Sequence, residues 1–176
     1  MKIGIDISQL AYQNTGVANY LQNLVQALIA QDTKNEYILF YSSLRRKLHP
    51  ASVVFAAKKN VTIKQFSLPP TLLDILWNRL HIFPIENFIG TVDIFLSSDW
   101  TQPPSKSKKA TILYDLIVYT YPKETAQKII ETQKRKLHWV KKEIDMVFCI
   151  SGATKKDAEK FLHLPEEKLH VIYPGL

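Results

Sequence analysis

The alternation of strand-like and helical patterns is the feature that most constrains how this chain can fold. Short segments rich in branched and aromatic residues recur, and each is followed by apolar residues at helical spacing. Several strand-like segments are apolar throughout, which is typical of strands buried on both faces. The pattern predicts one three-layer α/β/α Rossmann-like domain over residues 1–176, with a mostly parallel sheet.

The expected elements follow directly from this pattern. Strands are expected at 2–7, 36–41, 60–66, 92–98, 110–116, 145–150 and 168–173, and helices at 17–29, 71–83, 123–143 and 151–162. Two helices have a predicted buried stripe: Leu72, Ile75, Leu76 and Leu80 in the first, and Ala126, Ile130, Leu137, Val140 and Ile144 in the second.

The composition is that of a globular protein with a core. Apolar residues make up 46% of the 176 residues, and the single cysteine, Cys149, lies in the apolar run "MVFCI", where a buried, unreactive thiol is expected. The N-terminus "MKIGIDI" is strand-like and unlike a signal peptide, and no run approaches the roughly 20 apolar residues that span a bilayer. We therefore expect a cytoplasmic protein.

The net charge of +7 allows nucleic acid, anionic lipid or phosphate-bearing ligands as partners. In the helix expected at 123–143, Lys128, Arg135 and Lys142 fall on one stripe with Trp139 beside them. Such a face suits peripheral contact with an anionic membrane. The alternative is a solvated face whose tryptophan folds onto a neighbouring helix.

Ligands of open parallel sheets bind outside the carboxyl ends of the strands. This rule selects four stretches: 8–16, 97–109, 114–121 and 151–154. Gly16 opens a helix, where a missing side chain lets a ligand approach backbone N–H groups. Tyr114 and Asp115 could orient a hydroxyl or accept its proton. Ser151 is expected to cap the helix that follows it, by accepting from the N–H of Ala153 or Thr154.

Other common sites are not indicated. The dinucleotide motif G-x-G-x-x-G and the P-loop motif are both absent. The five histidines, at positions 49, 81, 138, 163 and 170, do not pair at ligand spacing, so we expect no metal and no bound cofactor. The aromatic residues form no stacking platform, which argues against nucleic acid as a partner.

Together these segments resemble the N-terminal half of a retaining glycosyltransferase of the GT-B fold, of the group called group 1 or family 4. The resemblance rests on "MKIGIDISQL", "TGVANYLQNLVQAL", "ILYDLIVYTYPKE" and, most specifically, "VFCISGATKKDAEKFLHLPEEKLHVIYPGL". It covers nearly the whole chain, although residues 43–92 are not distinctive. In this family the "VIYPG" segment leads toward a second domain that holds most nucleotide-sugar contacts, so we expect the chain to lack its C-terminal, donor-binding domain.

The resemblance implies a role for several residues. Gly16 and Val17 belong to the loop that approaches the diphosphate and sugar of the donor, although Ala18 and Asn19 depart from the common "T-G-I-G-R-Y" pattern. Tyr114-Asp115-Leu116 replaces the common "H-D-L" motif, which leaves hydrogen bonding as the expected task of Tyr114. The acceptor-side loops are expected to present Asp99, Trp100, Ser151 and Thr154.

The implied reaction is transfer of a sugar from a UDP- or GDP-linked donor to a hydroxyl on a glycan or lipid-linked acceptor, with retention and without a metal. The isolated half is expected to be folded but inactive. Two alternatives stay open at this point. The chain could be a complete nucleotide- or sugar-binding module, or a basic nucleic-acid-binding protein, which we rank last.

Overall fold

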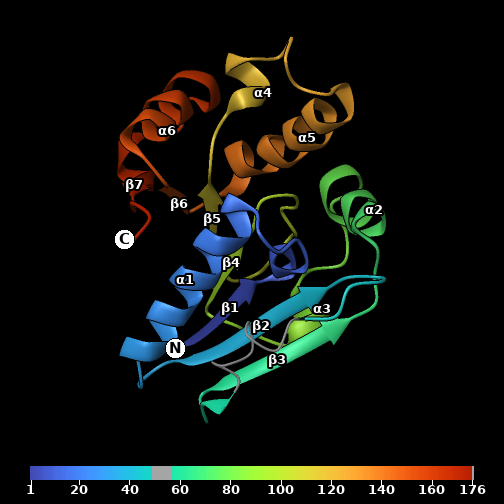
Figure 1. Cartoon of the computed structure of the whole chain (residues 1–176), viewed down its shortest axis with the longest axis vertical. Helices are drawn as coiled ribbons and strands as arrows, with labels where there is room; N and C mark the ends of the chain where they lie inside the picture. The colour runs from blue at the N-terminus through green and yellow to red at the C-terminus, as the bar shows by residue number, and fades with distance from the viewer. Residues whose placement is uncertain (49–56, 176) are drawn as a thin grey trace.

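The fold is seen in a computed structural model, which describes residues 1–48 and 57–175. Seven strands form one sheet in the order β3-β2-β1-β4-β5-β6-β7, and every neighbouring pair is parallel (Figure 1). The strands are β1 (Lys2–Asp6), β2 (Glu36–Ser42), β3 (Val61–Phe66), β4 (Ile94–Ser97), β5 (Lys108–Leu113), β6 (Met146–Cys149) and β7 (Leu169–Val171). The predicted Rossmann-like α/β fold is therefore confirmed.

Helix α1 (Gly16–Gln31) covers one face of the sheet. It begins at Gly16 because the Thr15 side chain accepts a hydrogen bond from the Ala18 N–H, 3.2 Å away. Its buried residues Leu21, Val25 and Ile29 pack with residues of the central strands in one core cluster. This burial fixes the start of α1 just beyond the carboxyl end of β1.

The opposite face is covered by helices from the rest of the chain. Helices α2 (Pro70–Leu73) and α3 (Glu86–Ile89) pack over Phe40 and Phe95, whereas α5 (Gln127–Glu143) and α6 (Gly152–Asp157) pack over Leu113, Val147 and Cys149. Cys149 is fully buried, as predicted. The sheet is therefore sandwiched between helical layers.

The predicted buried stripe of the helix near residues 71–83 was wrong for Leu72, Ile75 and Leu80, whereas Leu76 is half-buried against the core. The α-helical turn of α2 continues into a π-helix at Asp74–Arg79, which changes which side chains face the sheet. Leu73 and Trp77 are buried, whereas Leu72, Ile75 and Leu80 are exposed. Trp77 is anchored because its indole N–H donates to the Phe83 carbonyl at 3.0 Å.

The long helix near residues 123–143 starts later than predicted. α5 begins at Gln127, and Ala126, expected on the buried stripe, is exposed. The other four members of that stripe, Ile130, Leu137, Val140 and Ile144, are buried as predicted. A short helix, α4 (Ile117–Thr120), and the turns at 121–126 fill the stretch before it.

Candidate functional site

The candidate site lies at the carboxyl edge of the sheet, where β1 and β4 are neighbours. The chain runs outward from β1 through β2 to β3, and it then returns to β4 and runs outward the other way. The loops after β1 and β4 therefore leave the sheet in opposite directions, and open parallel sheets commonly bind ligands where the strand order reverses in this way. The four stretches selected from the sequence all follow strands at this edge.

The N-terminus of α1 forms one side of this edge. Gly16 is exposed, and a methyl group built at its Cα would meet no atom within 4 Å. The folded chain thus gives no packing reason for glycine at this position. The Val17 side chain is half-buried against the core cluster under α1.

A buried cluster of charged side chains lies beneath the edge. Lys136 of α5 is 1% exposed, and Asp6 at the end of β1 is 5% exposed. Burial lowers the pKa of Lys136 to about 8, although the nearby Asp99 and Asp6 raise it. Burial raises the pKa of Asp99 and of Asp6, and the Lys136 charge opposes both shifts. The charge of Lys136 therefore acts on both carboxylates, although the described residues form no ion pair within 4 Å between Lys136 and either of them.

Asp99 is oriented by the same helix that supplies Lys136. The Gln133 amide donates to the Asp99 carbonyl at 3.2 Å and to its carboxylate at 3.5 Å. The longer contact holds the carboxylate loosely and leaves most of its capacity to accept hydrogen bonds unused. Asp6 differs, because its carboxylate accepts a hydrogen bond of 2.8 Å from the Ser8 N–H.

Tyr114 is the most buried of the predicted catalytic residues. It is 7% exposed and meets Tyr20 edge to face, with the ring centroids 5.6 Å apart. Burial raises the pKa of its phenol, and the nearby Asp99 charge adds to this shift. The Tyr20 hydroxyl donates to the Ile172 carbonyl at 3.1 Å, which ties α1 to the segment after β7.

Three deeply buried polar atoms at this edge lack a hydrogen-bond partner among the described residues. They are the Tyr114 hydroxyl, the Ser98 hydroxyl and the Gln102 amide nitrogen. Ser98 lies close enough to Tyr114 to lower its phenol pKa, yet neither hydroxyl has a partner in good geometry. Buried polar groups are nearly always paired with protein, water or a ligand, so these atoms make the edge of the β4–β5 pair a candidate place of contact with water or a ligand.

The remaining predicted residues are placed as follows. Asp115 is exposed, and its carboxylate accepts from the Ile117 N–H at 3.1 Å. Ser151 caps α6 as expected, because its hydroxyl accepts from the Thr154 N–H at 3.1 Å. The Thr154 hydroxyl contacts the Tyr114 carbonyl at 3.3 Å. Trp100 is half-buried, and its carbonyl accepts from Asn78 at 2.9 Å.

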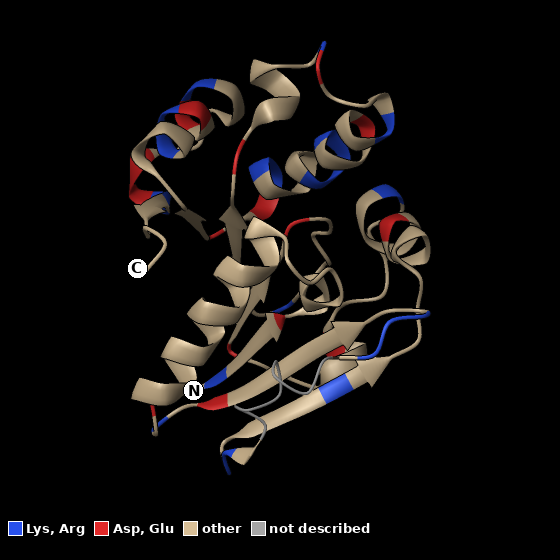
Figure 2. Ribbon diagram, viewed as in Figure 1, with Lys and Arg blue, Asp and Glu red and all other residues tan. Residues whose placement is uncertain are grey.

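The basic stripe of α5 is only partly available to a partner. Arg135 pairs with Asp74 at 2.8 Å, and the Trp139 ring stacks on His81 with centroids 3.6 Å apart. The Trp139 N–H also donates to the Asn78 carbonyl at 2.8 Å. Trp139 is therefore folded onto the neighbouring π-helix, as the alternative interpretation expected. Lys128 and Lys142 stay exposed, and Figure 2 shows positive charge along α5.

Lys136 and Ser98 were missed from the sequence. Lys136 looked like one more cation of a basic helix, although it lies one turn before the buried Val140, a spacing that could have indicated burial. Ser98 ended an expected strand and carried no motif. Its position directly before Asp99 at the end of β4 is the signal that could have found it.

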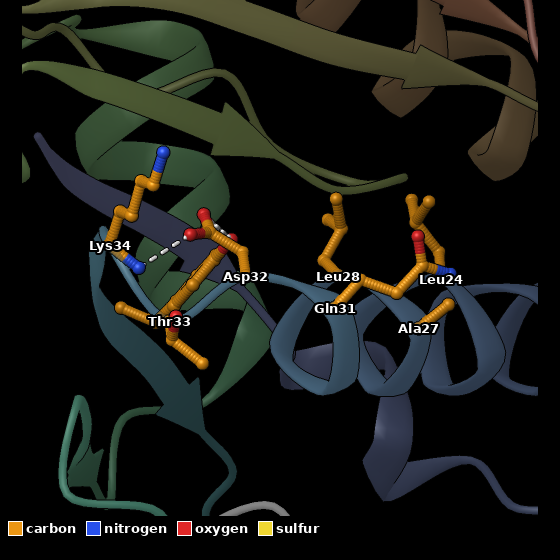
Figure 3. Close-up of a pocket in the computed structure, with 8 residues that line it drawn as sticks. Leu24, Ala27, Leu28, Gln31, Asp32, Thr33 and Lys34 are labelled. Carbon is orange, nitrogen blue, oxygen red and sulfur yellow. Dashed lines mark hydrogen bonds between the residues drawn. The ribbon is translucent and has the colours of Figure 1, made fainter.

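One clear hollow lies away from this site. It measures about 500 Å³ and is formed at the C-terminal end of α1 by Leu24, Leu28 and Asp32, among others (Figure 3). Hydrogen bonds from Asn35, Tyr37 and the Lys34 N–H hold the pKa of Asp32 below its usual range. Its carboxylate is thus already satisfied where α1 ends. The hollow adjoins the beginning of β2, opposite the carboxyl edge, so we assign it no role in the site.

Two further searches of the described residues bear on ligands and membranes. Across 1–48 and 57–175, no three His, Cys, Asp or Glu side chains gather as a metal site. Within those same ranges, no helix combines the length and the apolar character needed to cross a bilayer.

The fold is that of a Rossmann-like domain of the kind found in GT-B proteins. The family described as Glycosyltransferase Family 4 matches residues 14–176, and the chain belongs to this family. No curated protein matches the chain.

Solved structures show the same fold in proteins of low sequence identity. The lipopolysaccharide outer core galactosyltransferase WaaB, in its apo form, aligns with a TM-score of 0.50 at 13% identity, over 98% of this chain. UDP-GlcNAc 2-epimerase from Neisseria meningitidis, bound to UDP-GlcNAc, aligns with a TM-score of 0.53 at 12% identity, over 97% of this chain. The chain spans only 45% and 46% of those two structures.

Proposed function

We propose that this chain is the acceptor-side domain of a retaining glycosyltransferase. The enzyme would transfer a sugar from a UDP- or GDP-linked donor to a hydroxyl on a glycan or lipid-linked acceptor. The observation that carries the proposal is the family match over residues 14–176, which begins beside the N-terminus of α1 at the carboxyl edge. A second domain, outside this chain, would supply most contacts to the nucleotide.

The chemistry proposed for this domain is binding and positioning. Negative charge develops on the departing diphosphate, and the positive N-terminal end of α1 stabilises it once the donor lies across Gly16. The acceptor lies over the loops after β4 and β5, where Asp99, Tyr114 and Asp115 can bind its hydroxyl groups. The departing phosphate itself can accept the acceptor proton, so no protein base and no metal ion is required.

The experiment for this proposal is sugar transfer by the full-length protein. Nucleotide release from a panel of UDP- and GDP-hexoses identifies the donor, and the Gly16→Trp and Asp115→Ala variants are then compared with wild type. Both should lower turnover while leaving the circular dichroism spectrum and the melting temperature unchanged. Undiminished turnover in both variants would place the reaction elsewhere.

The 176-residue chain alone gives a second test. Because the nucleotide contacts are assigned to another domain, calorimetry with UDP or GDP should detect no binding to this chain. Tight binding of either nucleotide would instead favour a complete nucleotide-binding module.

We also propose that the domain contacts an anionic membrane, which would suit a lipid-linked acceptor. Leu80, Ile82 and Phe83 are exposed apolar side chains around His81, the residue that stacks on Trp139 of α5. The exposed Lys141 and Lys142 belong to the same end of α5. An apolar group beside cations matches the interface of an anionic bilayer. We call Leu80, Ile82, Phe83, Lys141 and Lys142 the interfacial patch.

A further inference from the structure

The segment that follows the π-helix carries the apolar part of the interfacial patch on an unusual backbone. His81 has a φ of 51° and Phe83 has a φ of 59°, both in the left-handed region. Bulky residues are uncommon there, and such a conformation persists only where the surrounding contacts hold it. The contacts of this segment therefore determine how Leu80, Ile82 and Phe83 are presented at the surface.

The His81 ring is enclosed by three groups, and its side chain is only 11% exposed. Nδ1 lies 2.8 Å from the Trp77 carbonyl oxygen, Nε2 lies 3.1 Å from Oε1 of Glu143, and the ring face stacks on Trp139. Glu143 is the last residue of α5, and its Oε2 lies 3.8 Å from the Lys109 ammonium group of β5. The ring thus joins the strained segment to the end of α5.

The partners of the ring determine where its hydrogen atoms lie. A carbonyl oxygen only accepts, so Nδ1 of His81 carries the hydrogen that the Trp77 carbonyl accepts. In the neutral ring, Nε2 then has a lone pair that faces Glu143, whose carboxylate also only accepts. Nε2 of His81 and Oε1 of Glu143 are both buried and lack a hydrogen-bond partner among the described residues. Protonation of the ring turns this unfavourable contact into a charge-assisted hydrogen bond.

Charged and titratable groups reach the surroundings of the ring from each element packed there. They are Glu143, His138 and Lys142 on α5, Lys109 on β5, and Asp74 and Arg79 on the π-helix. Asp74 is already paired with Arg79 and with Arg135. Among the described residues, Glu143 is therefore the one carboxylate within 4 Å of the His81 ring.

We propose that His81 is a protonation-dependent clamp. The charged ring holds Leu80, Ile82 and Phe83 beside the cations of α5, and the neutral ring releases them, so the interfacial patch is complete at acidic pH. This inference rests on the proposed membrane contact, because it assigns that contact a regulation. An anionic bilayer suits such a clamp, since a surface potential of about −30 mV concentrates protons roughly threefold at the membrane.

The first experiment reads the hydrogen positions of the ring directly and needs no membrane. Long-range ¹H–¹⁵N NMR spectra of the 176-residue chain distinguish the two neutral forms of each histidine, and His81→Gln identifies the His81 signals. At about pH 8, where an ordinary histidine is neutral, His81 should carry its hydrogen on Nδ1. At acidic pH both ring nitrogens should carry one. A neutral His81 with its hydrogen on Nε2 would overturn the clamp.

The second experiment measures the urea midpoint against pH for wild type and His81→Gln. An unfolded histidine protonates near pH 6.5, and the hydrogen bond to Glu143 needs the charged ring. The stability that this bond adds is therefore complete below that pH and is lost as the pH rises. The urea midpoint of wild type, relative to that of His81→Gln, should fall between about pH 5.5 and pH 8.

His138→Gln is the matched control for the urea experiment. His138 is exposed on α5 and meets Trp139 edge to face, and among the described residues it forms no ion pair. This variant should keep the pH dependence of wild type. A difference between wild type and His81→Gln that stays constant with pH would show a purely structural role for the ring and would overturn the clamp.

The third experiment measures sedimentation of the chain with phosphatidylglycerol vesicles. Binding by wild type should fall several-fold from about pH 5.5 to pH 8 as the histidine ring loses its charge. Glu143→Gln is the decisive variant, because an amide can donate to the lone pair of the neutral His81 ring and hold the clamp at both pH values. It should lose most of this pH dependence, whereas His138→Gln should keep it.

The outcomes separate the clamp from the membrane contact. The same pH dependence in wild type and in Glu143→Gln would mean that vesicle binding follows general charge, and it would overturn the regulation. No vesicle binding by wild type at either pH would refute the proposed membrane contact and its regulation together. The hydrogen positions and the urea midpoints would still report on the ring itself.

Discussion

At the scale of single residues, Gly4 and Gly16 lie in opposite surroundings, one crowded and one open. A methyl group added at Gly4 in β1 would lie 2.8 Å from side-chain atoms of both Ile89 and Phe95. A methyl group added at Gly16 would meet nothing within 4 Å. Gly4 is therefore explained by packing within the domain, whereas the described residues give no packing reason for glycine at position 16.

The two alanine substitutions should separate stability from activity. Gly4→Ala should lower the free energy of unfolding by about 1–3 kcal/mol because it overpacks the core. Gly16→Ala should leave it unchanged or raise it slightly, since alanine favours a helix, while sugar transfer by the full-length protein falls about tenfold or more. Urea unfolding and transfer assays measure these effects. A destabilised Gly16→Ala would contradict the open environment of this residue.

Buried Lys136 should leave a signature in the pH dependence of stability. Its pKa is lowered to about 8 in the folded state from an ordinary value near 10.5, so the unfolded chain binds more protons between these values. Stability should therefore rise with pH from about 8, by roughly 1–2 kcal/mol up to pH 9.5, below the range where tyrosines titrate. The rise should be absent in Lys136→Met. Urea unfolding measures the free energy of unfolding of both proteins at each pH. The same change with pH in wild type and in Lys136→Met would contradict the burial of the ammonium group.

The sequence located part of the site and missed the rest for a physical reason. Gly16, Asp99, Tyr114 and Asp115 follow strands, so the topology of a parallel sheet was enough to select them. Lys136 comes from a helix, and its approach to Asp99 depends on how α5 packs on the sheet. Contacts between distant segments of this kind are not encoded in any local pattern.

At the scale of elements, the contact between α5 and the π-helix is the main bridge between two segments far apart in sequence. Trp139 stacks on His81, and Arg135 pairs with Asp74. Local periodicity predicted both helices but gave the wrong buried face for residues 70–79. The π-turn is the reason, because it changes the spacing of side chains after Asp74.

Trp139→Ala should lower the free energy of unfolding by about 2 kcal/mol or more, because it removes the stacked ring and the hydrogen bond to the Asn78 carbonyl. Lys128→Ala is the control, since Lys128 is exposed on the same helix and its loss should change stability by less than about 0.5 kcal/mol. Urea unfolding measures both. A neutral Trp139→Ala would mean that the ring is free for an external partner instead of bound to the π-helix.

At the scale of the whole molecule, the sequence predicted a parallel sheet but could not give the order of its strands. The pattern of each strand indicates burial on both faces. Many different strand orders would bury these strands equally well, so the pattern does not select one of them. The point where β1 and β4 become neighbours is therefore a property of the assembled sheet. The candidate site exists because this point brings the ends of β1 and β4 together under the N-terminus of α1.

The distribution of charge and apolar surface leads to the last prediction, which concerns the interfacial patch. The chain should bind vesicles containing phosphatidylglycerol more strongly than vesicles of phosphatidylcholine alone, because the net charge is +7 and α5 is basic. Binding should weaken as salt is added, since these cations are exposed and screened. Sedimentation with vesicles measures both effects.

Substitutions in the interfacial patch distinguish membrane contact through this patch from a general electrostatic attraction of the basic chain to anionic vesicles. Leu80 and Phe83 are 58% and 53% exposed, so a Leu80→Ser, Phe83→Ser double variant should keep its fold while vesicle binding falls several-fold. Leu28→Ser is the control, because Leu28 is an exposed apolar residue on α1, which covers the opposite face of the sheet. Lys142→Glu should also reduce binding, whereas Arg135→Glu is a poor test because Arg135 is paired with Asp74. Equal binding to both kinds of vesicle, or an equal loss in the Leu28 control, would contradict membrane contact at this end of α5. The carboxyl edge of the sheet would then be the only proposed place of contact with an acceptor.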